Sequence, residues 1–373
     1  MRIFSLSNAS VVEIDRLTPL DAIRLPPQGY LWIACARGEF ELMQGQIQAQ
    51  LQALCGMQLV DLHISDLLSH QLPSHYDYTS QYDLLVFRRL AAGNSPADLA
   101  QPGLPPHRLP ARGGPPILRR IDTSPVGFAV FDHILLTVHP TDCAVRDAYA
   151  SKLLGSATAE SHAAGARAPS SPADLMLRIV NHMVDGYLEL RRELTHQLDH
   201  WQTELLNPKT RFNNWASLLQ ARLSLHHLDE ICEDQRSAMQ DWIEALKTWP
   251  DAETSVGQRE RDLLHVRSRD VLEHIERVVH HVRRLEQSAE TAVQMHFNAQ
   301  SHRTNEIMRT LTVLTAIFLP LNLIAGIFGM NFEYIPLLHR ANGFMLAMGL
   351  MLAIAFGLGL LFWRKRYLER SAR

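Results

Sequence analysis

One uncharged stretch near the C-terminus constrains this chain more than any other feature. It runs from Leu311 to Phe332, reads LTVLTAIFLPLNLIAGIFGMNF, and lies between Arg309 and Glu333 without an ionisable side chain. A second uncharged run, Gly343 to Trp363, follows after a short polar connection. As a helix, each run is about long enough to cross the ~30 Å hydrocarbon core of a membrane. The sequence therefore predicts two membrane-spanning helices joined by a short loop.

Polar and small side chains recur along one side of the first run. Alternating steps of four and three residues place them on one helical face. We call this set the polar stripe: Met308, Thr312, Thr315, Leu319, Asn322 and Gly326. Polar groups that face hydrocarbon are costly, so the stripe should face protein or water. It is either a helix–helix contact made by small and polar residues or the lining of a pore. A pore requires several copies of the chain, because two helices cannot enclose a channel.

The first run closes with Gly329-Met330-Asn331, and Phe332-Glu333-Tyr334-Ile335-Pro336 follows. From Ser301 to Pro336 and into the basic tail, the chain resembles the CorA family of divalent-cation transporters. The hallmark of that family is a Gly-Met-Asn motif at the end of the first of two C-terminal spans. The motif is specific here because it follows a long helix and an uncharged span and precedes a second span. The related ZntB zinc transporters often vary the middle residue, so Met330 favours the magnesium-type branch.

The resemblance implies a fold, and the local patterns agree with it. It implies an α+β cytosolic domain in the form of an α/β/α sandwich, a long stalk helix, two C-terminal transmembrane helices and a homopentameric funnel. Apolar and β-branched runs predict strands at Tyr30–Ala34, Asp83–Leu90 and Val126–Val138, the last broken into a hairpin at Asp132-His133. Helical periodicity is present from Glu39 to Leu54.

Three long helical regions follow the predicted strands. They cover Asp174 to Leu206, Phe212 to Lys247, and a third region that starts near Val256 and has no convincing breaker until Pro320. Pro320 removes one backbone hydrogen bond and favours a bend. The third region keeps a heptad-like seam formed by Val271, Ile275, Val278, Val282 and Leu285. It predicts one helix of roughly 60 residues, about 90 Å long, which corresponds by resemblance to the stalk helix of the family.

These patterns divide the chain into successive parts. We expect a cytosolic α/β domain at 1–150 with a Pro-rich insert at 95–116, a helical stalk domain at 151–308, a pore-lining span at 309–331, an external loop at 332–342, a second span at 343–363 and a basic cytosolic tail at 364–373. Basic residues concentrate in the tail, whereas the loop offers only Arg340. The positive-inside rule therefore places both termini in the cytoplasm of a cell whose inner (plasma) membrane holds the spans. Met1–Ser10 lacks a sustained apolar region, so we expect no signal peptide.

The end of the first span has chemistry suited to a hydrated dication. Mg²⁺ requires octahedral oxygen coordination and dehydrates reluctantly, and a ring of neutral amides can hydrogen-bond its water shell. We expect a selectivity filter of Gly329, Met330 and Asn331, with Glu333 just outside attracting cations. By resemblance, the pore-lining positions are Asn305, Met308, Thr315, Leu319, Asn322 and Gly326. Asn322 stands where the family commonly has Thr, and Thr315 where it has a small apolar residue.

The two spans also bear on how transport is driven. Neither contains an ionisable side chain, whereas proton-coupled carriers usually need one within the membrane. The membrane potential supplies about 4.6 kcal/mol per 100 mV for a dication. We expect channel-like influx of Mg²⁺, with Co²⁺ or Ni²⁺ as further cargo; the alternative is a proton-coupled Zn²⁺ transporter of the ZntB type.

A membrane-anchored sensor or enzyme is a different class of alternative. The chain has no nucleotide loop, HExxH or GxSxG motif, and a tether would not need a polar stripe. We therefore expect no enzyme and no cofactor, with lipid, divalent cations and other copies of the chain as partners. The formal charge of −3 gives no reason to expect nucleic acid.

Regulation is inferred mainly from resemblance. In the family, cytosolic Mg²⁺ binds acidic residues between subunits and closes the pore, but Gln294 stands where one such acid is expected. The remaining candidate ligands are Asp61, Asp66, Glu286 and Glu290, although each is more simply a solvated charge. The histidine pairs His226-His227 and His280-His281 raise zinc or nickel as cargo or sensor, although surface and packing roles are simpler. The four cysteines show no CxxC spacing and suggest a reduced cytosolic domain.

Overall fold

The chain forms two compact units, Met1–Glu290 and Thr291–Arg373. The computed structural model describes residues 1–7, 10–15, 17–90, 123–156, 168–206, 215–250, 254–330 and 342–364. The Pro-rich insert expected at 95–116 lies outside these residues, as do most of the expected external loop and the basic tail.

The first unit is built on one seven-stranded sheet with the order β2-β1-β3-β7-β6-β5-β4. Its strands are β1 (Arg2–Ser7), β2 (Val11–Glu13), β3 (Gly29–Ala36), β4 (His75–Tyr78), β5 (Asp83–Leu90), β6 (Thr123–Val130) and β7 (Ile134–His139). Only the central pair β3/β7 is parallel among these strands, and the other neighbours are antiparallel. The central strands are buried on both faces, which explains why their sequences are nearly continuous apolar runs.

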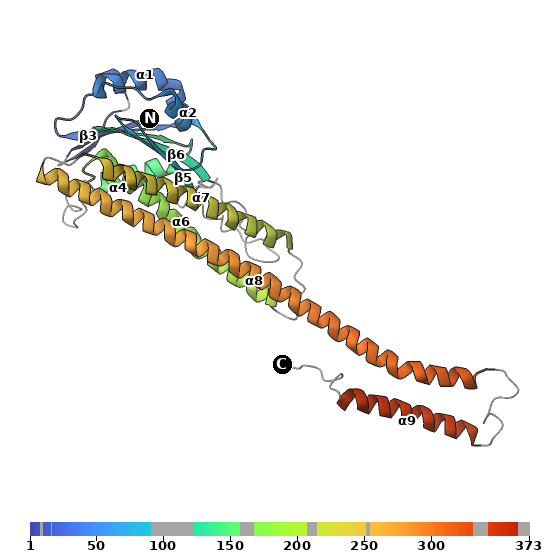
Figure 1. The fold of residues 1–373 in the computed structure, drawn as a ribbon. Helices are drawn as coiled ribbons and strands as arrows, with labels where there is room; N and C mark the ends of the chain where they lie inside the picture. The colour runs from blue at the N-terminus through green and yellow to red at the C-terminus, as the bar shows by residue number, and fades with distance from the viewer. Residues whose placement is uncertain are drawn as a thin grey trace. The chain divides into compact units, whose positions relative to one another are not determined.

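Helices cover both faces of this sheet (Figure 1). The helices α1 (Arg37–Cys55) and α2 (Asp61–Leu68) lie on one face, and η1 (Leu20–Ala22), a short 3₁₀ turn, packs against α1. The other face carries α4 (Ala144–Ser156), α6 (Pro172–Leu206) and α7 (Trp215–Thr248). This three-layer arrangement confirms the predicted α/β/α sandwich.

The strand predictions in this unit are confirmed. The expected strand at Tyr30–Ala34 is the middle of β3, and β5 has the predicted bounds, Asp83 to Leu90. The predicted break at Asp132-His133 falls between β6 and β7, which pair antiparallel. The predicted helix at Glu39–Leu54 is α1.

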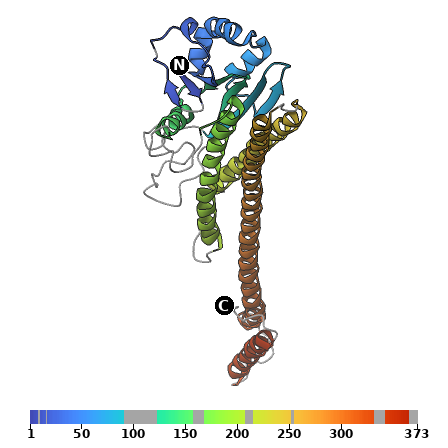
Figure 2. The ribbon, with the colours of Figure 1, turned by 90° about the vertical axis from the view of Figure 1, so that its left-hand side faces the viewer.

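The helix α8 (Ser255–Phe328) contains 74 residues and continues through Pro320, so it is longer than predicted. Proline has no N–H, so the carbonyl of Ala316 loses its usual helical donor, a loss that membrane spans tolerate. Within the first unit, α8 packs with α6 and α7 on the same side of the sheet (Figures 1 and 2). The predicted seam is confirmed, because its five members are 0–6% exposed.

Polar contacts fix α8 against its two neighbours in this unit. The indole of Trp242 on α7 donates to Ser268 Oγ at 2.9 Å. From α6, the side-chain amide of Gln202 donates to Ser288 Oγ at 2.6 Å. These bonds, together with the buried seam, make the first part of α8 an integral member of the soluble unit.

The second unit contains the end of α8 and α9 (Gly343–Arg364). Both helices are long and apolar enough to cross a membrane. Almost none of either apolar segment is buried inside the chain. The soluble α/β domain, long helix and two apolar helices together confirm the predicted fold class.

Candidate pore-forming surface

The last six turns of α8 have a shielded side and an exposed side. Val313 is 3% exposed. The partly buried residues around it recur every three or four positions, which places them on the same side of the helix. The shielded set is Arg309, Val313, Ala316, Ile317, Pro320, Leu321, Ile324 and Phe328. It contains no member of the polar stripe.

The helix α9 also has one shielded stripe. It consists of Gly343, Ala347, Met351, Ile354, Ala355, Leu358, Gly359 and Phe362. Four of its members are Gly or Ala at four-residue multiples, a spacing that lets helix backbones approach closely. In Figure 1, α9 returns along the end of α8. The shielded stripes therefore mark the sides on which the two spans of one chain pack.

The polar stripe lies on the exposed side of α8. Met308 is 60% exposed and Leu319 is 70% exposed. The other members, Thr312, Thr315, Asn322 and Gly326, are exposed as well, and so is Asn305 one turn before the stripe. The stripe is therefore not the surface that α8 turns towards α9. The stripe was interpreted either as a helix–helix contact or as a pore lining. For the described residues, a contact between the two spans of the same chain is excluded, because the stripe is exposed.

The threonines of the stripe are arranged to offer oxygen lone pairs. The hydroxyl of Thr312 donates to the carbonyl of Met308 at 2.8 Å, and that of Thr315 donates to the carbonyl of Leu311 at 2.8 Å. A hydroxyl has one hydrogen, so each is satisfied within the helix. What remains on the exposed surface is an acceptor, which suits water in the shell of a cation or the cation itself.

Two glycines shape the outer part of this surface. A Cβ added at Gly326 would meet nothing within 4 Å, so its absence leaves open space beside the helix. The N–H of Gly329 bonds to the carbonyl of Ala325 at 2.9 Å and closes the last turn of α8. Met330 is 48% exposed and ends the described segment. Asn331 and Glu333, the other predicted residues of the mouth, lie outside the described residues.

The candidate regulatory acids are not gathered into one site within a single chain. Asp61 is exposed at the start of α2, and Asp66 lies 3.7 Å from the imidazole of His75. On α8, Glu286 is half-buried, whereas Glu290 is half-exposed and 3.8 Å from Arg222. In the part of the chain that the structure describes, no three His, Cys, Asp or Glu residues are grouped to hold a metal ion.

The histidines singled out by their pairing have local partners. His226 and His227 both approach the carboxylate of Glu230, at 3.7 and 3.5 Å. His281 Nε2 is 2.8 Å from the hydroxyl of Thr195 across the α6–α8 contact. These contacts describe surface and packing roles. The four cysteines form no disulfide, and Cys35, Cys143 and Cys232 are buried.

Comparison with known proteins identifies the family. Residues 43–366 match the family described as CorA-like Mg²⁺ transporter protein. This chain belongs to the CorA family. That family is one of transporters and not of enzymes, which confirms that no catalytic site should be expected.

Individual CorA relatives match parts of the sequence. The cobalt/magnesium transport protein CorA of Thermotoga maritima is 25% identical over 202 residues, 52% of this chain and 52% of that protein. The magnesium transport protein CorA of Haemophilus influenzae is 35% identical over 101 residues, 27% of this chain and 32% of that protein. The chain thus spans about half, or less, of the length of these curated relatives.

A solved structure covers the whole architecture. The CorA magnesium transporter from Methanocaldococcus jannaschii matches with a TM-score of 0.68 and 18% identity, covering 97% of each chain. At this identity the likeness shows the fold. It includes the soluble domain, the long helix and the two C-terminal apolar helices.

Proposed function

We propose that this CorA-family chain forms a channel-like pathway for Mg²⁺ influx, with Co²⁺ or Ni²⁺ as further cargo, driven by the membrane potential. One observation carries the proposal: the polar stripe of α8 is exposed on the side that does not pack within the hairpin. The relatives are a cobalt/magnesium and a magnesium transport protein, which supports Mg²⁺ and Co²⁺ as the class of ion.

The exposed stripe requires partners in a membrane. A surface of Thr, Asn and Gly facing lipid would leave polar groups in hydrocarbon. Several copies of α8 around a common axis bring the stripes together and leave α9 outside. The resemblance to CorA sets the number at five. A native mass of five chains in mild detergent is the expected result, and a protein that is only monomeric or dimeric would contradict the pore.

In such an assembly the stripe would line a path with polar and apolar levels in succession. At the outer mouth, Gly329, Met330 and Asn331 form the filter, and rings of Asn331 amides hydrogen-bond the water shell of the ion. Further in, Asn322 and Thr315 offer oxygen acceptors, whereas Leu319 and Met308 form apolar constrictions that gate by dewetting. Asn305 lines the cytosolic entrance. Glu333 lies beyond the filter and raises the local concentration of cations.

The orientation follows from charge and gives the driving force its direction. The chain spans the inner membrane with both termini in the cytoplasm, so the filter faces outward. A negative cell interior then draws dications inward. Residues 310–332 and 343–363 contain no ionisable side chain. A proton relay through these spans has no residue to use, which disfavours the proton-coupled Zn²⁺ alternative.

The test is ion uptake by the purified full-length protein in liposomes. Mg²⁺, Co²⁺, Ni²⁺ and Zn²⁺ are compared in parallel, each with an imposed membrane potential and with an imposed proton gradient. We expect the rate of Mg²⁺ uptake to rise with the imposed membrane potential and to be unchanged by the proton gradient. Zn²⁺ uptake that requires the proton gradient would establish the alternative, and no uptake of any dication would contradict transport.

A further inference from the structure

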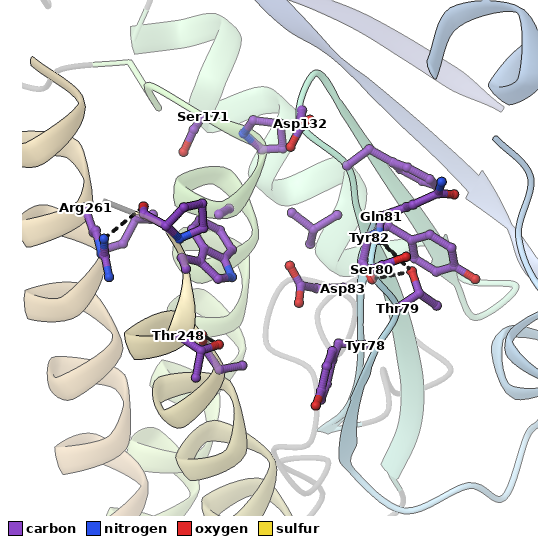
Figure 3. Close-up of a pocket in the computed structure, with 18 of the residues that line it drawn as sticks. Tyr78, Thr79, Ser80, Gln81, Tyr82, Asp83, Asp132, Ser171, Thr248 and Arg261 are labelled. Atoms are coloured by element: carbon purple, nitrogen blue, oxygen red, sulfur yellow. Dashed lines mark hydrogen bonds between the residues drawn. The ribbon is translucent and has the colours of Figure 1, made fainter. Parts of the chain in front are cut away.

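A cavity of about 670 Å³ lies in the soluble unit (Figure 3). Five segments meet there: the β4–β5 turn, the β6–β7 turn, the start of α6, the end of α7 and the start of α8. Its volume falls within the ~300–1,000 Å³ typical of pockets for organic molecules. None of the residues proposed for the pore or for regulation lines it.

The charges that line the cavity are mostly negative and stand on two walls. Asp83 and Asp132 belong to the strand turns, and in Figure 3 they lie across the gap from Arg261. Glu260 belongs to the helix side, next to Arg261 on α8. An incoming group thus meets carboxylates on both sides.

The guanidinium of Arg261 has a structural task of its own. It donates to the carbonyl of Pro250 at 3.0 Å and to the carbonyl of Lys247 at 3.3 Å. A cation at these carbonyls stabilises the C-terminal end of α7, where the helix dipole is negative. Arg261 also lines the cavity, so the described lining has three carboxylates, Asp83, Asp132 and Glu260, against one guanidinium, and its formal charge is negative.

Asp83 is the most enclosed of the three acids. The hydroxyl of Tyr76 donates to one of its oxygens at 2.5 Å, the only hydrogen bond to this carboxylate among the described residues. Burial raises the pKa of Asp83, and the nearby negative charge of Asp132 raises it further. A cation bound beside this carboxyl group would stabilise its charged form.

Aromatic rings complete the lining. The exposed ring of Tyr78 stacks on Tyr76, with centroids 6.1 Å apart and planes 18° from parallel. On the helix side, Trp249 meets the buried Trp242 edge-on at 5.7 Å. Ring faces attract ammonium groups and also pack against methylene chains.

We propose that this cavity binds an aliphatic polyamine, a flexible chain of methylenes with two or more ammonium groups. Carboxylates on opposite walls match separated positive charges, and the aromatic surface between them matches the apolar linker. A divalent metal ion fits less well, because the cavity has large apolar walls and the described residues provide no group of three metal-ligating side chains. An anionic ligand would be repelled by the three acids.

The experiment is equilibrium dialysis of radiolabelled spermidine with the full-length protein in detergent. We expect saturable binding of one spermidine per chain. Asp83→Asn and Glu260→Gln should each weaken it at least tenfold, and the double variant should abolish it. The matched control is Glu41→Gln, an exposed acid on α1 outside the cavity, which should bind like the parent.

Further arms separate the proposal from nonspecific attraction. Tyr78→Ala changes an exposed ring without removing a charge, so it should weaken binding several-fold while leaving circular dichroism and the melting temperature unchanged. Excess 1,8-octanediol should not compete, and Mg²⁺ should displace spermidine no better than NaCl of equal ionic strength. Unchanged binding by the double variant would overturn the proposal. Stoichiometric displacement of spermidine from the parent protein by Mg²⁺, beyond the effect of NaCl at equal ionic strength, would also overturn it, because it would assign the cavity to a metal ion. Neither result depends on ion transport.

Discussion

The two ends of α8 belong to one unbroken helix but use their apolar residues in opposite ways. In the soluble unit, the seam from Val271 to Leu285 is buried against the rest of the chain. In the apolar segment, large side chains such as Leu314, Phe318 and Leu323 are more than half exposed. Burying apolar surface is favourable only against water, and lipid tails are as apolar as leucine. The first end is therefore buried by its own chain, whereas for the second end we propose contact with lipid and with further copies of the chain.

The largest expected effect of a substitution lies at the outer end of the second region. Asn331→Ala removes one amide acceptor from every subunit of the proposed filter. Hydrogen bonds to a charged species are worth about 1.5–3 kcal/mol each, so losing a ring of them should abolish Mg²⁺ uptake by reconstituted protein. Asn342→Ala, an asparagine at the start of α9, is the control and should conduct normally. An Asn331→Ala protein that assembles and conducts like the parent would show that the filter is elsewhere.

A pair of leucine-sized truncations contrasts the two ends of α8 directly. Ile275 is 1% exposed in the soluble unit, so Ile275→Ala should reduce the free energy of unfolding by about 2–5 kcal/mol. Leu319 is 70% exposed, so Leu319→Ala should change stability by less than about 0.5 kcal/mol. It should instead widen an apolar constriction and increase ion leak. Denaturant unfolding and liposome flux measured on both variants test the contrast, and a strongly destabilised Leu319→Ala protomer would contradict it.

Sensitivity to pH should belong to the soluble unit, because the spans have no titratable group. His139 is fully buried in β7, and burial, then the charges of Arg146 and Arg89, lower its pKa to about 3. The hydroxyl of Thr137 accepts the indole N–H of Trp32 at 2.9 Å and lies 2.9 Å from His139 Nε2. Burial and the two nearby cations hold His139 neutral.

The sign of the pH effect follows from the lowered pKa. An unfolded histidine titrates near pH 6.5, so between about pH 6.5 and 3 the unfolded state binds more protons than the folded state. Stability is then complete above pH 6.5 and falls with acidification, by about 1–2 kcal/mol between pH 6.5 and 5. His139→Gln should flatten this part of the profile in denaturant titrations at several pH values. An unchanged slope would exclude His139 as the source.

The smallest effect is expected in regulation, at the boundary between the two regions. Gln294 is exposed on α8, one turn beyond Glu290. If acids at this level bind cytosolic Mg²⁺, Gln294→Asp should strengthen inhibition of flux by internal Mg²⁺ several-fold. Gln300→Asp adds the same charge on another face of the helix and should not. Equal inhibition in both variants and the parent would show that sensing, if present, uses other residues.

Most of the fold was predictable because its signals are local. The apolar runs of β5 and β7, the break at Asp132-His133 and the seam of α8 each follow from neighbouring residues. The predicted length of roughly 60 residues was too short, because the helix does not end near Pro320 but continues to Phe328.

The candidate site was only partly predictable for a different reason. The spacing of the polar stripe was visible in the sequence, but hydropathy does not distinguish an apolar side chain that faces lipid from one that packs on α9. The shielded set around Val313 and Ile324 required the structure. The cavity lined by Asp83 and Glu260 required it as well, because five separate segments meet there.

The most direct test of the exposed stripe is its access to water in the membrane. Single cysteines are introduced from residue 313 to 326 in a Cys55→Ser background, which leaves only the three buried native thiols. A small, positively charged thiol reagent is then applied to the protein in liposomes while Mg²⁺ flux is recorded. We predict reaction and loss of flux at 315, 319, 322 and 326, with protection by Mg²⁺, and no reaction at 317, 321 and 324. Reaction on the shielded positions, or none on the stripe, would contradict a pore lined by this face of α8.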